Sequence, residues 1–139
     1  MTKPNPNLTA DEALKILTDY SCLQIKVVDF DIDKEKLRQA IQLVSSLCDG
    51  ENIGICADNC QEGFKTLTNY LEALGLSANL ETNQSVPQNT PVYIKFNTKT
   101  MSYYLDSYTG NYRGVLISCQ SENPQLAGTY GHFPLNLFS

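Results

Sequence analysis

The stretch from residue 91 to residue 120 constrains the fold most, because its pattern predicts three β-strands joined by two short turns. Val92, Ile94 and Phe96 alternate with polar residues, which is typical of a strand with one buried face. The run at 115–118 is apolar on both faces and indicates an interior strand. The predicted strands are 92–97, 101–107 and 112–120, with turns at 97–100 and 109–111.

Three helices precede this stretch, each marked by capping residues and by apolar residues at helical spacing. Thr9 and Glu12 have the spacing of a capping box, in which each side chain satisfies a free amide of the first turn. Asn59 and Glu62 repeat that spacing, and Gly75 follows as a C-terminal stop. The middle helix is capped by Asp31 or Asp33, and its buried stripe is Leu37, Ala40, Ile41, Val44, Leu47 and Cys48.

The remaining segments predict a further strand and a tail. Residues 51–57 form a short apolar run of strand length that leads directly into the third helix. Residues 23–30 are rich in β-branched residues and fit either a strand or an extended connector. We expect the tail to close an edge of the sheet, with Leu135, Leu137 and Phe138 pinning it to the core.

Together these segments predict an α+β fold: an antiparallel sheet of four or five strands with about three helices packed mainly on one face. The 139 residues are enough for one domain with its own core, so we expect a single domain over 1–139. Pro4, Pro6 and the asparagines around them predict a flexible N-terminal arm at 1–8.

The excess of acidic over basic residues restricts the classes of function that this chain can have. The net charge is −5, the pI is about 4.7, and the ten basic residues are scattered, whereas nucleic-acid binding needs clustered Lys and Arg. No apolar run approaches the roughly 20 residues that cross a bilayer, so we expect no membrane role. The N-terminus lacks the apolar region of a secretory signal, which predicts a cytoplasmic protein. Five irregularly spaced cysteines then predict reduced thiols.

The polar and aromatic hairpin at 102–113 is the leading candidate for a functional surface. Tyrosine offers a flat contact area with a polar tip and arginine can grip a carboxylate, so both are enriched in binding hot spots. Strand alternation places Tyr104, Asp106 and Tyr108 on one face. The structural alternative is that the tyrosines only favour strands and that Arg113 pairs with Asp106. The candidate binding residues are Tyr104, Asp106, Tyr108, Tyr112, Arg113, Tyr130 and His132.

These residues favour a non-catalytic binding or interaction module. We expect its partner to be a protein or a small anionic molecule, and the chain to be a monomer or a small homo-oligomer. The alternative is a small enzyme with a pocket around Cys119, His132, Arg113 and Asp106. Cys119 and His132 are the two residue types that thiolate catalysis requires, a nucleophile and a base, but no nucleophile elbow or oxyanion-hole motif accompanies them.

We expect neither a metal nor a cofactor. Cys56 and Cys60 form one loose pair, to which Cys119 and His132 could add two ligands, whereas structural zinc sites usually show paired knuckles. The strand-to-helix turn before Cys60 could hold an anion, but Asp58 and Asn59 are expected to cap its amides themselves. No glycine-rich phosphate motif is present.

Three motifs carry a family resemblance: NIGICADNCQEG at 52–63, YRGVLISCQ at 112–120 and GTYGHFPLNLF at 128–138. With these motifs, the chain resembles a small, chiefly cyanobacterial family known as a domain of unknown function. The resemblance implies a cytosolic protein and carries over no activity, cofactor or catalytic residue. It directs attention to the third strand of the hairpin region, the Tyr130–His132 loop and the Asp58 turn.

Overall fold

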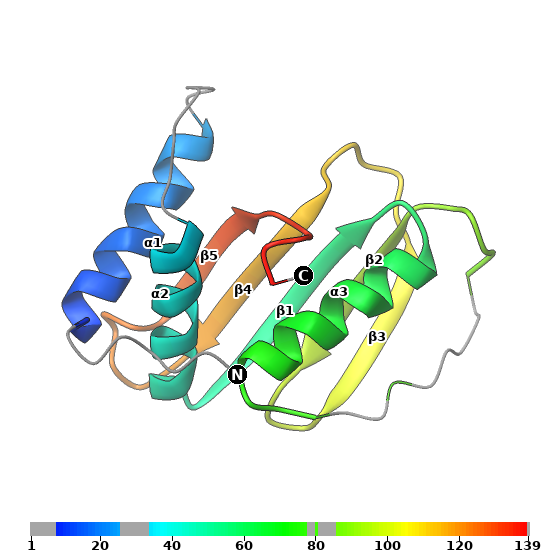
Figure 1. The fold of residues 1–139 in the computed structure, drawn as a ribbon. Helices are drawn as coiled ribbons and strands as arrows, with labels where there is room; N and C mark the ends of the chain where they lie inside the picture. The colour runs from blue at the N-terminus through cyan, green and yellow to red at the C-terminus, as the bar shows by residue number, and fades with distance from the viewer. Residues whose placement is uncertain (1–7, 26–33, 78–79, 81–85, 139) are drawn as a thin grey trace.

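A computed structural model describes residues 8–25, 34–77, 80 and 86–138. Figure 1 shows one sheet with the helices on one of its faces, which confirms the predicted α+β class. None of the helices in these ranges is long and apolar enough to cross a membrane. In chain order the elements are α1 (Ala10–Ile25), α2 (Lys34–Leu47), β1 (Gly50–Ala57), α3 (Cys60–Ala73), β2 (Val92–Asn97), β3 (Ser102–Ser107), β4 (Gly114–Gln120) and β5 (Gly128–Phe133).

The five strands form an antiparallel sheet in the order β3-β2-β1-β4-β5. β1 lies at the centre, where Ile55 is the register partner of Ile94 in β2 and of Val115 in β4. The apolar strand β4 is interior, as predicted, and β5 closes the edge beside it. The stretch 130–132, expected as a loop, is therefore part of an edge strand.

Alternation along the strands gives the sheet a covered face and an uncovered face. α3 packs on β1 and β2, while α1 packs on α2 and β5, so the three helices share one side of the sheet (Figure 1). The strand residues buried against them are Ile53, Ile55, Ala57, Val92, Ile94, Phe96, Val115, Ile117, Cys119, Tyr130 and Phe133.

The predicted capping residues hold the helix ends. The amide of Glu12 donates to Thr9 Oγ1 at 3.1 Å, and the amide of Glu62 donates to Asn59 Oδ1 at 2.8 Å. Gly75 takes a φ of 76°, and the Leu76 amide then donates to the carbonyl of Leu71 at 2.8 Å. The starts of α1 and α3 and the end of α3 were therefore predictable from local sequence.

Other expectations for the helices need correction. α1 continues to Ile25, so residues 23–25 are helical and not a strand, while 26–30 lie outside the described residues. Leu47 was expected in the buried stripe of α2, yet its exposed fraction is 42%. The proposed caps Asp31 and Asp33 also lie outside the described residues, as does the predicted arm apart from Leu8, which packs against the core.

The C-terminal tail folds back over the helical side of the sheet (Figure 1). Leu137 is 2% exposed, and its carbonyl accepts a hydrogen bond from Arg38 Nε at 2.6 Å. The Phe138 ring packs edge-on against Tyr70, whose hydroxyl donates to the carbonyl of Pro134 at 2.8 Å. The prediction that apolar tail residues pin this segment to the core is confirmed.

Candidate functional site

The uncovered face carries a row of side chains that crosses the sheet. The register pairs Tyr104 of β3 with Lys95 of β2, Lys95 with Gly54 of β1, and Gly54 with Leu116 of β4. These positions alternate with the core residues of the same strands, so their side chains point away from the helices. Within the described ranges, no helix lies on this side (Figure 1).

Two glycines allow neighbouring side chains to lie flat on this face. A Cβ added at Gly54 would lie 3.3 Å from the Tyr93 hydroxyl oxygen and 3.4 Å from its ring, so the Tyr93 ring lies across β1. A Cβ added at Gly131 would collide with the Leu116 side chain, which therefore lies across β5. An aromatic ring thus covers the central strand β1, and an apolar side chain covers the edge strand β5.

Tyr104 is the most exposed aromatic side chain of this surface, with an exposed fraction of 55%. Its hydroxyl donates to Asp106 Oδ2 at 2.8 Å, and this hydrogen bond raises the pKa of Tyr104. Tyr103 points to the covered face, where its ring packs edge-on against Phe64 at 5.5 Å between centroids. The predicted alternation of the hairpin is confirmed for these residues.

Arg113 binds a different carboxylate from the one expected. Its Nε donates to Asp58 Oδ1 at 2.7 Å, whereas the structural alternative drawn from the sequence paired it with Asp106. Its Nη1 also donates to the carbonyl oxygens of Gly110 at 3.0 Å and Tyr112 at 2.9 Å. Arg113 therefore ties the β3–β4 loop to the turn between β1 and α3.

Tyr108 and Cys56 lie beside this arginine. The Arg113 guanidinium carbon is 5.7 Å from the centroid of the Tyr108 ring, a cation–π distance. Cys56 is a free thiol with 6% exposure, and burial raises its pKa. A hydrogen bond to Tyr108 and the positive charge of Arg113 lower the pKa of this thiol and so oppose the effect of burial.

His132 lies at the same end of the sheet and is exposed. Its backbone takes a φ of 62°, and its carbonyl accepts a hydrogen bond from the Tyr20 hydroxyl at 3.0 Å. The imidazole meets the Tyr112 ring edge-on at 5.1 Å between centroids. Burial raises the pKa of Tyr112 to about 12, so this phenol is neutral at physiological pH.

Not all the predicted site residues come together. Tyr108, Tyr112, Arg113 and His132 gather at the end of the sheet where β4 begins, and Tyr104 and Asp106 lie along β3. Tyr130 instead points into the covered face, where its hydroxyl donates to the Leu126 carbonyl at 3.0 Å. The proposed enzyme pocket is not assembled, because Arg113 precedes β4 and Cys119 lies near its other end.

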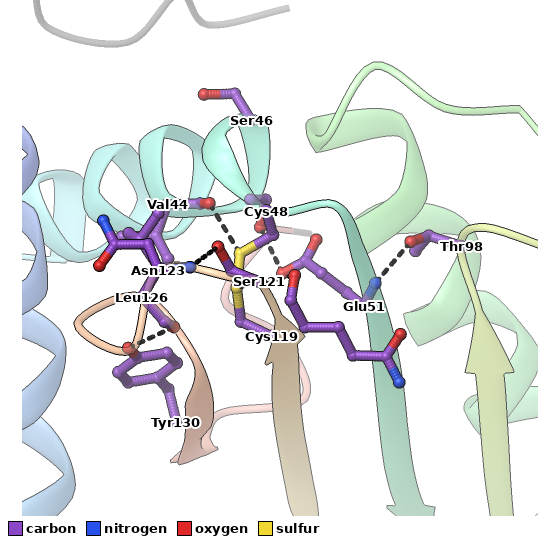
Figure 2. Close-up of a disulfide and its surroundings, with 12 residues drawn as sticks. Val44, Ser46, Cys48, Glu51, Thr98, Cys119, Ser121, Asn123, Leu126 and Tyr130 are labelled. Atoms are coloured by element: carbon purple, nitrogen blue, oxygen red, sulfur yellow. Dashed lines mark hydrogen bonds between the residues drawn. A yellow bond between two sulfur atoms is a disulfide. The ribbon is translucent and has the colours of Figure 1, made fainter.

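Cys119 forms a disulfide with Cys48, the residue that follows α2 (Figure 2). Their Cα atoms are 5.9 Å apart, although the residues are separated by 71 positions in the chain. The prediction of reduced thiols is therefore wrong for this pair, whereas Cys56 and Cys60 are free. The bond also removes Cys119 from the candidate thiolate pair with His132 and from the candidate zinc ligands.

Glu51 is a buried carboxylate that was not predicted. It is 4% exposed and is the register partner of Cys119, so the two side chains are neighbours on the covered face. Ser45 Oγ donates to Glu51 Oε2 at 2.9 Å. Burial raises the pKa of Glu51 to about 7, and the Ser45 hydrogen bond opposes that rise. One feature of the sequence could have indicated this buried carboxylate: a glutamate occupies an inward-facing position of an otherwise apolar strand.

Glu51 lies between two cavities. On the outer side, a polar groove of about 260 Å³ is lined by residues from the α2–β1 connection and from the β2–β3 turn. On the inner side, a void of about 10 Å³ has room for about one water molecule. The groove residues with polar or sulfur side chains include Ser45, Cys48, Asp49, Glu51, Thr98 and Lys99.

Comparison with known proteins places the chain in a family. The model of a family described as Domain of unknown function (DUF1824) matches residues 15–138. The chain belongs to this family. Its structure is similar to the crystal structure, at 2.11 Å resolution, of an uncharacterised protein from the cyanobacterium Anabaena variabilis ATCC 29413. That match has a TM-score of 0.76 and 40% sequence identity, and it covers 95% of this chain and 100% of the other. No curated protein matches the chain significantly.

The family resemblance seen in the sequence is confirmed, and the structure brings its three motifs together. Asp58 comes from the first motif, Arg113 and Tyr112 from the second, and His132 from the third. The Asp58–Arg113 ion pair and the Tyr112–His132 ring contact connect all three at one end of the sheet. These motifs therefore mark one place in the fold.

Proposed function

We propose that the chain is a non-catalytic binding module that holds a protein partner on the uncovered face of its sheet. The observation that carries this proposal is the unequal cover of the two faces. Helices bury one face, while Tyr93, Tyr104 and Leu116 lie on the other, which no described helix covers. Flat aromatic and apolar surface of this kind gains free energy when a partner removes it from water.

The charges of this surface favour a protein over a small anion. Lys95 and Asp106 are the charged side chains of the described strands that point to this side, and their charges balance. Arg113, the other candidate for an anion, already donates to Asp58 and to two carbonyl oxygens. A neutral aromatic surface on a chain of net charge −5 suits a protein surface that is itself largely uncharged.

Two observations support a binding role over catalysis. Cys119, the candidate nucleophile, is held in a disulfide, and Arg113 lies at the opposite end of β4. The remaining candidates are tyrosines and a histidine at one edge, an arrangement typical of binding hot spots. A cytoplasmic location remains part of the proposal and can be checked by cell fractionation.

The first test is site-specific photo-crosslinking in the cells that express the chain. A benzophenone amino acid replaces Tyr104 on the uncovered face or, as the control, Lys65, which is exposed on α3. We expect one discrete protein adduct from position 104 and none from position 65. Equal capture at both positions, or no adduct at 104, would overturn the proposal, as would an adduct with a second copy of this chain.

The second test measures affinity with the captured partner after purification. We expect the double variant Tyr104→Ala/Leu116→Ser to bind at least about tenfold more weakly, because aromatic anchors carry most of the binding energy of an interface. The matched control is Lys65→Ala/Thr68→Ala on the exposed side of α3, which should bind as the wild type does. Unchanged affinity of the first variant would refute this use of the surface.

A further inference from the structure

The Cys48–Cys119 disulfide has an accessible sulfur and a buried one. Cys48 is partly exposed and lines the polar groove, whereas Cys119 is 5% exposed and lies behind it on β4. Glu51 lines the same groove and is the cross-strand neighbour of Cys119 (Figure 2). A reactant that enters the groove therefore contacts the Cys48 sulfur first. The Glu51 carboxylate lies beside Cys119, whose sulfur is the leaving group when Cys48 is attacked.

We propose that Cys48 and Cys119 form a dithiol–disulfide exchange site for an external dithiol, with Glu51 supplying the proton to the departing Cys119 sulfur. A disulfide that only braces the fold gives no reason to place a carboxylate beside it. Glu51 is buried there at an electrostatic cost that the Ser45 hydrogen bond partly offsets. A role in proton transfer accounts for both its position and its access to the groove.

The exchange balances in two steps. A thiolate of the external dithiol attacks Cys48 Sγ, a new disulfide forms there, and the Cys48–Cys119 bond breaks with its electron pair on Cys119 Sγ. That sulfur takes the proton of Glu51. The second thiolate of the dithiol then attacks the first sulfur of the same dithiol, which is bonded to Cys48 Sγ in the mixed disulfide. This releases the Cys48 thiolate, which is protonated by water. The external dithiol is oxidised, the protein gains two thiols, and Glu51 is reprotonated from the groove.

Proton transfer matters here because neither thiolate is stabilised by its surroundings. Cys119 is buried in the core layer, and Cys48 follows the C-terminus of α2, where the helix dipole disfavours negative charge. A departing Cys119 thiolate beside an ionised carboxylate would place two negative charges on neighbouring strands. Transfer of the proton leaves one charge on Glu51, where the Ser45 hydroxyl and the groove can stabilise it.

The surroundings also accommodate the reduced state. The Cys48 sulfur lies 3.1 Å from the Val44 carbonyl oxygen, a hydrogen-bonding distance for a thiol (Figure 2). Other ionisable groups near Glu51 are Asp49 and Lys99, both exposed at the groove, and Tyr130 on β5, whose hydroxyl already donates to a backbone carbonyl. Glu51 is therefore the buried acid closest to Cys119 in the described sheet.

The experiment follows reduction of the oxidised full-length protein by dithiothreitol. Samples are quenched in acid, alkylated, and analysed by peptide mass spectrometry for thiols at Cys48 and Cys119. We expect Glu51→Gln to be reduced at least about tenfold more slowly than wild type at about pH 6, since a positioned acid contributes about a hundredfold or more. The rate ratio should fall about tenfold between about pH 6 and about pH 8, because only about a tenth of Glu51 is still protonated at the higher pH. Glu72→Gln, an exposed position on α3, is the control.

Equal rates for wild type and Glu51→Gln at every pH would overturn the role of Glu51. Alkylation of both cysteines before any dithiothreitol is added would overturn the site itself. If Glu51→Gln does not fold, Ser45→Ala provides the second test. Loss of the Ser45 hydrogen bond raises the pKa of Glu51, so the pH dependence should move to higher pH, and an unmoved profile would contradict the proposal.

Discussion

The stability of this protein should fall as its buried glutamate ionises. Glu51 is 4% exposed, and burial raises its pKa from an ordinary value of 4.5 to about 7. The folded state therefore binds the Glu51 proton more tightly than the unfolded state does. The resulting stabilisation is fully present below about pH 4.5 and is lost as the pH rises to about 7. At about 1.4 kcal/mol for each pH unit, that difference in pKa corresponds to about 3 kcal/mol.

Urea unfolding of wild type and Glu51→Gln from about pH 4.5 to about pH 8, without reductant, measures this effect. The glutamine side chain of this variant can still accept the Ser45 hydrogen bond and does not ionise, so other titrations cancel in the comparison. We expect the wild type to lose about 3 kcal/mol relative to Glu51→Gln across this range. The control Glu72→Gln should follow the wild type. A difference between Glu51→Gln and wild type that does not vary with pH would refute the argument from burial.

Three further predictions concern single contacts. The double variant Cys48→Ser/Cys119→Ser should lose about 4 kcal/mol of unfolding free energy, the chain-entropy value for a loop of 71 residues; urea unfolding that shows less than about 1 kcal/mol would contradict it. Arg113→Ala should cost only about 1 kcal/mol by the same assay, because its ion pair is partly exposed, and a loss of several kcal/mol would mark a structural role. Gly131→Ala should cost about 1–2 kcal/mol through its clash with Leu116, and Leu116→Ala should relieve most of that cost in a double-mutant cycle.

The sequence predicted the features that depend on near neighbours. Helix starts at Thr9 and Asn59 were recognisable because a capping pair lies within one turn. The strand at 92–97 was recognisable because side-chain alternation has a period of two residues. In both cases the physical cause lies within a few residues, so an isolated stretch of sequence already contains it.

The features that were missed depend on contacts between distant segments. The Asp58–Arg113 pair and the Cys48–Cys119 bond each join parts of the chain that only the sheet register brings together. The sequence assigned the residues of the predicted hairpin to one face or the other of their strand. It did not identify the turn that holds Asp58 as the neighbour of Arg113. The rise in the pKa of Glu51 has the same origin, because burial by α2 and β4 becomes evident only once the register is known.

The two proposed sites lie on opposite faces of the sheet and share the strand β4, and their separation predicts that they act independently. Cys119 points to the helices, and Leu116 points away from them. β1 and β4 stay in register from Gly50 opposite Gln120 to Cys56 opposite Gly114, so their hydrogen bonds hold the strands with or without the disulfide. We therefore expect the purified partner to bind reduced and oxidised protein with equal affinity in a titration. A severalfold difference in affinity between the two forms would show that the redox state of the disulfide alters the uncovered face through the backbone of β4. The disulfide would then act as a switch for binding.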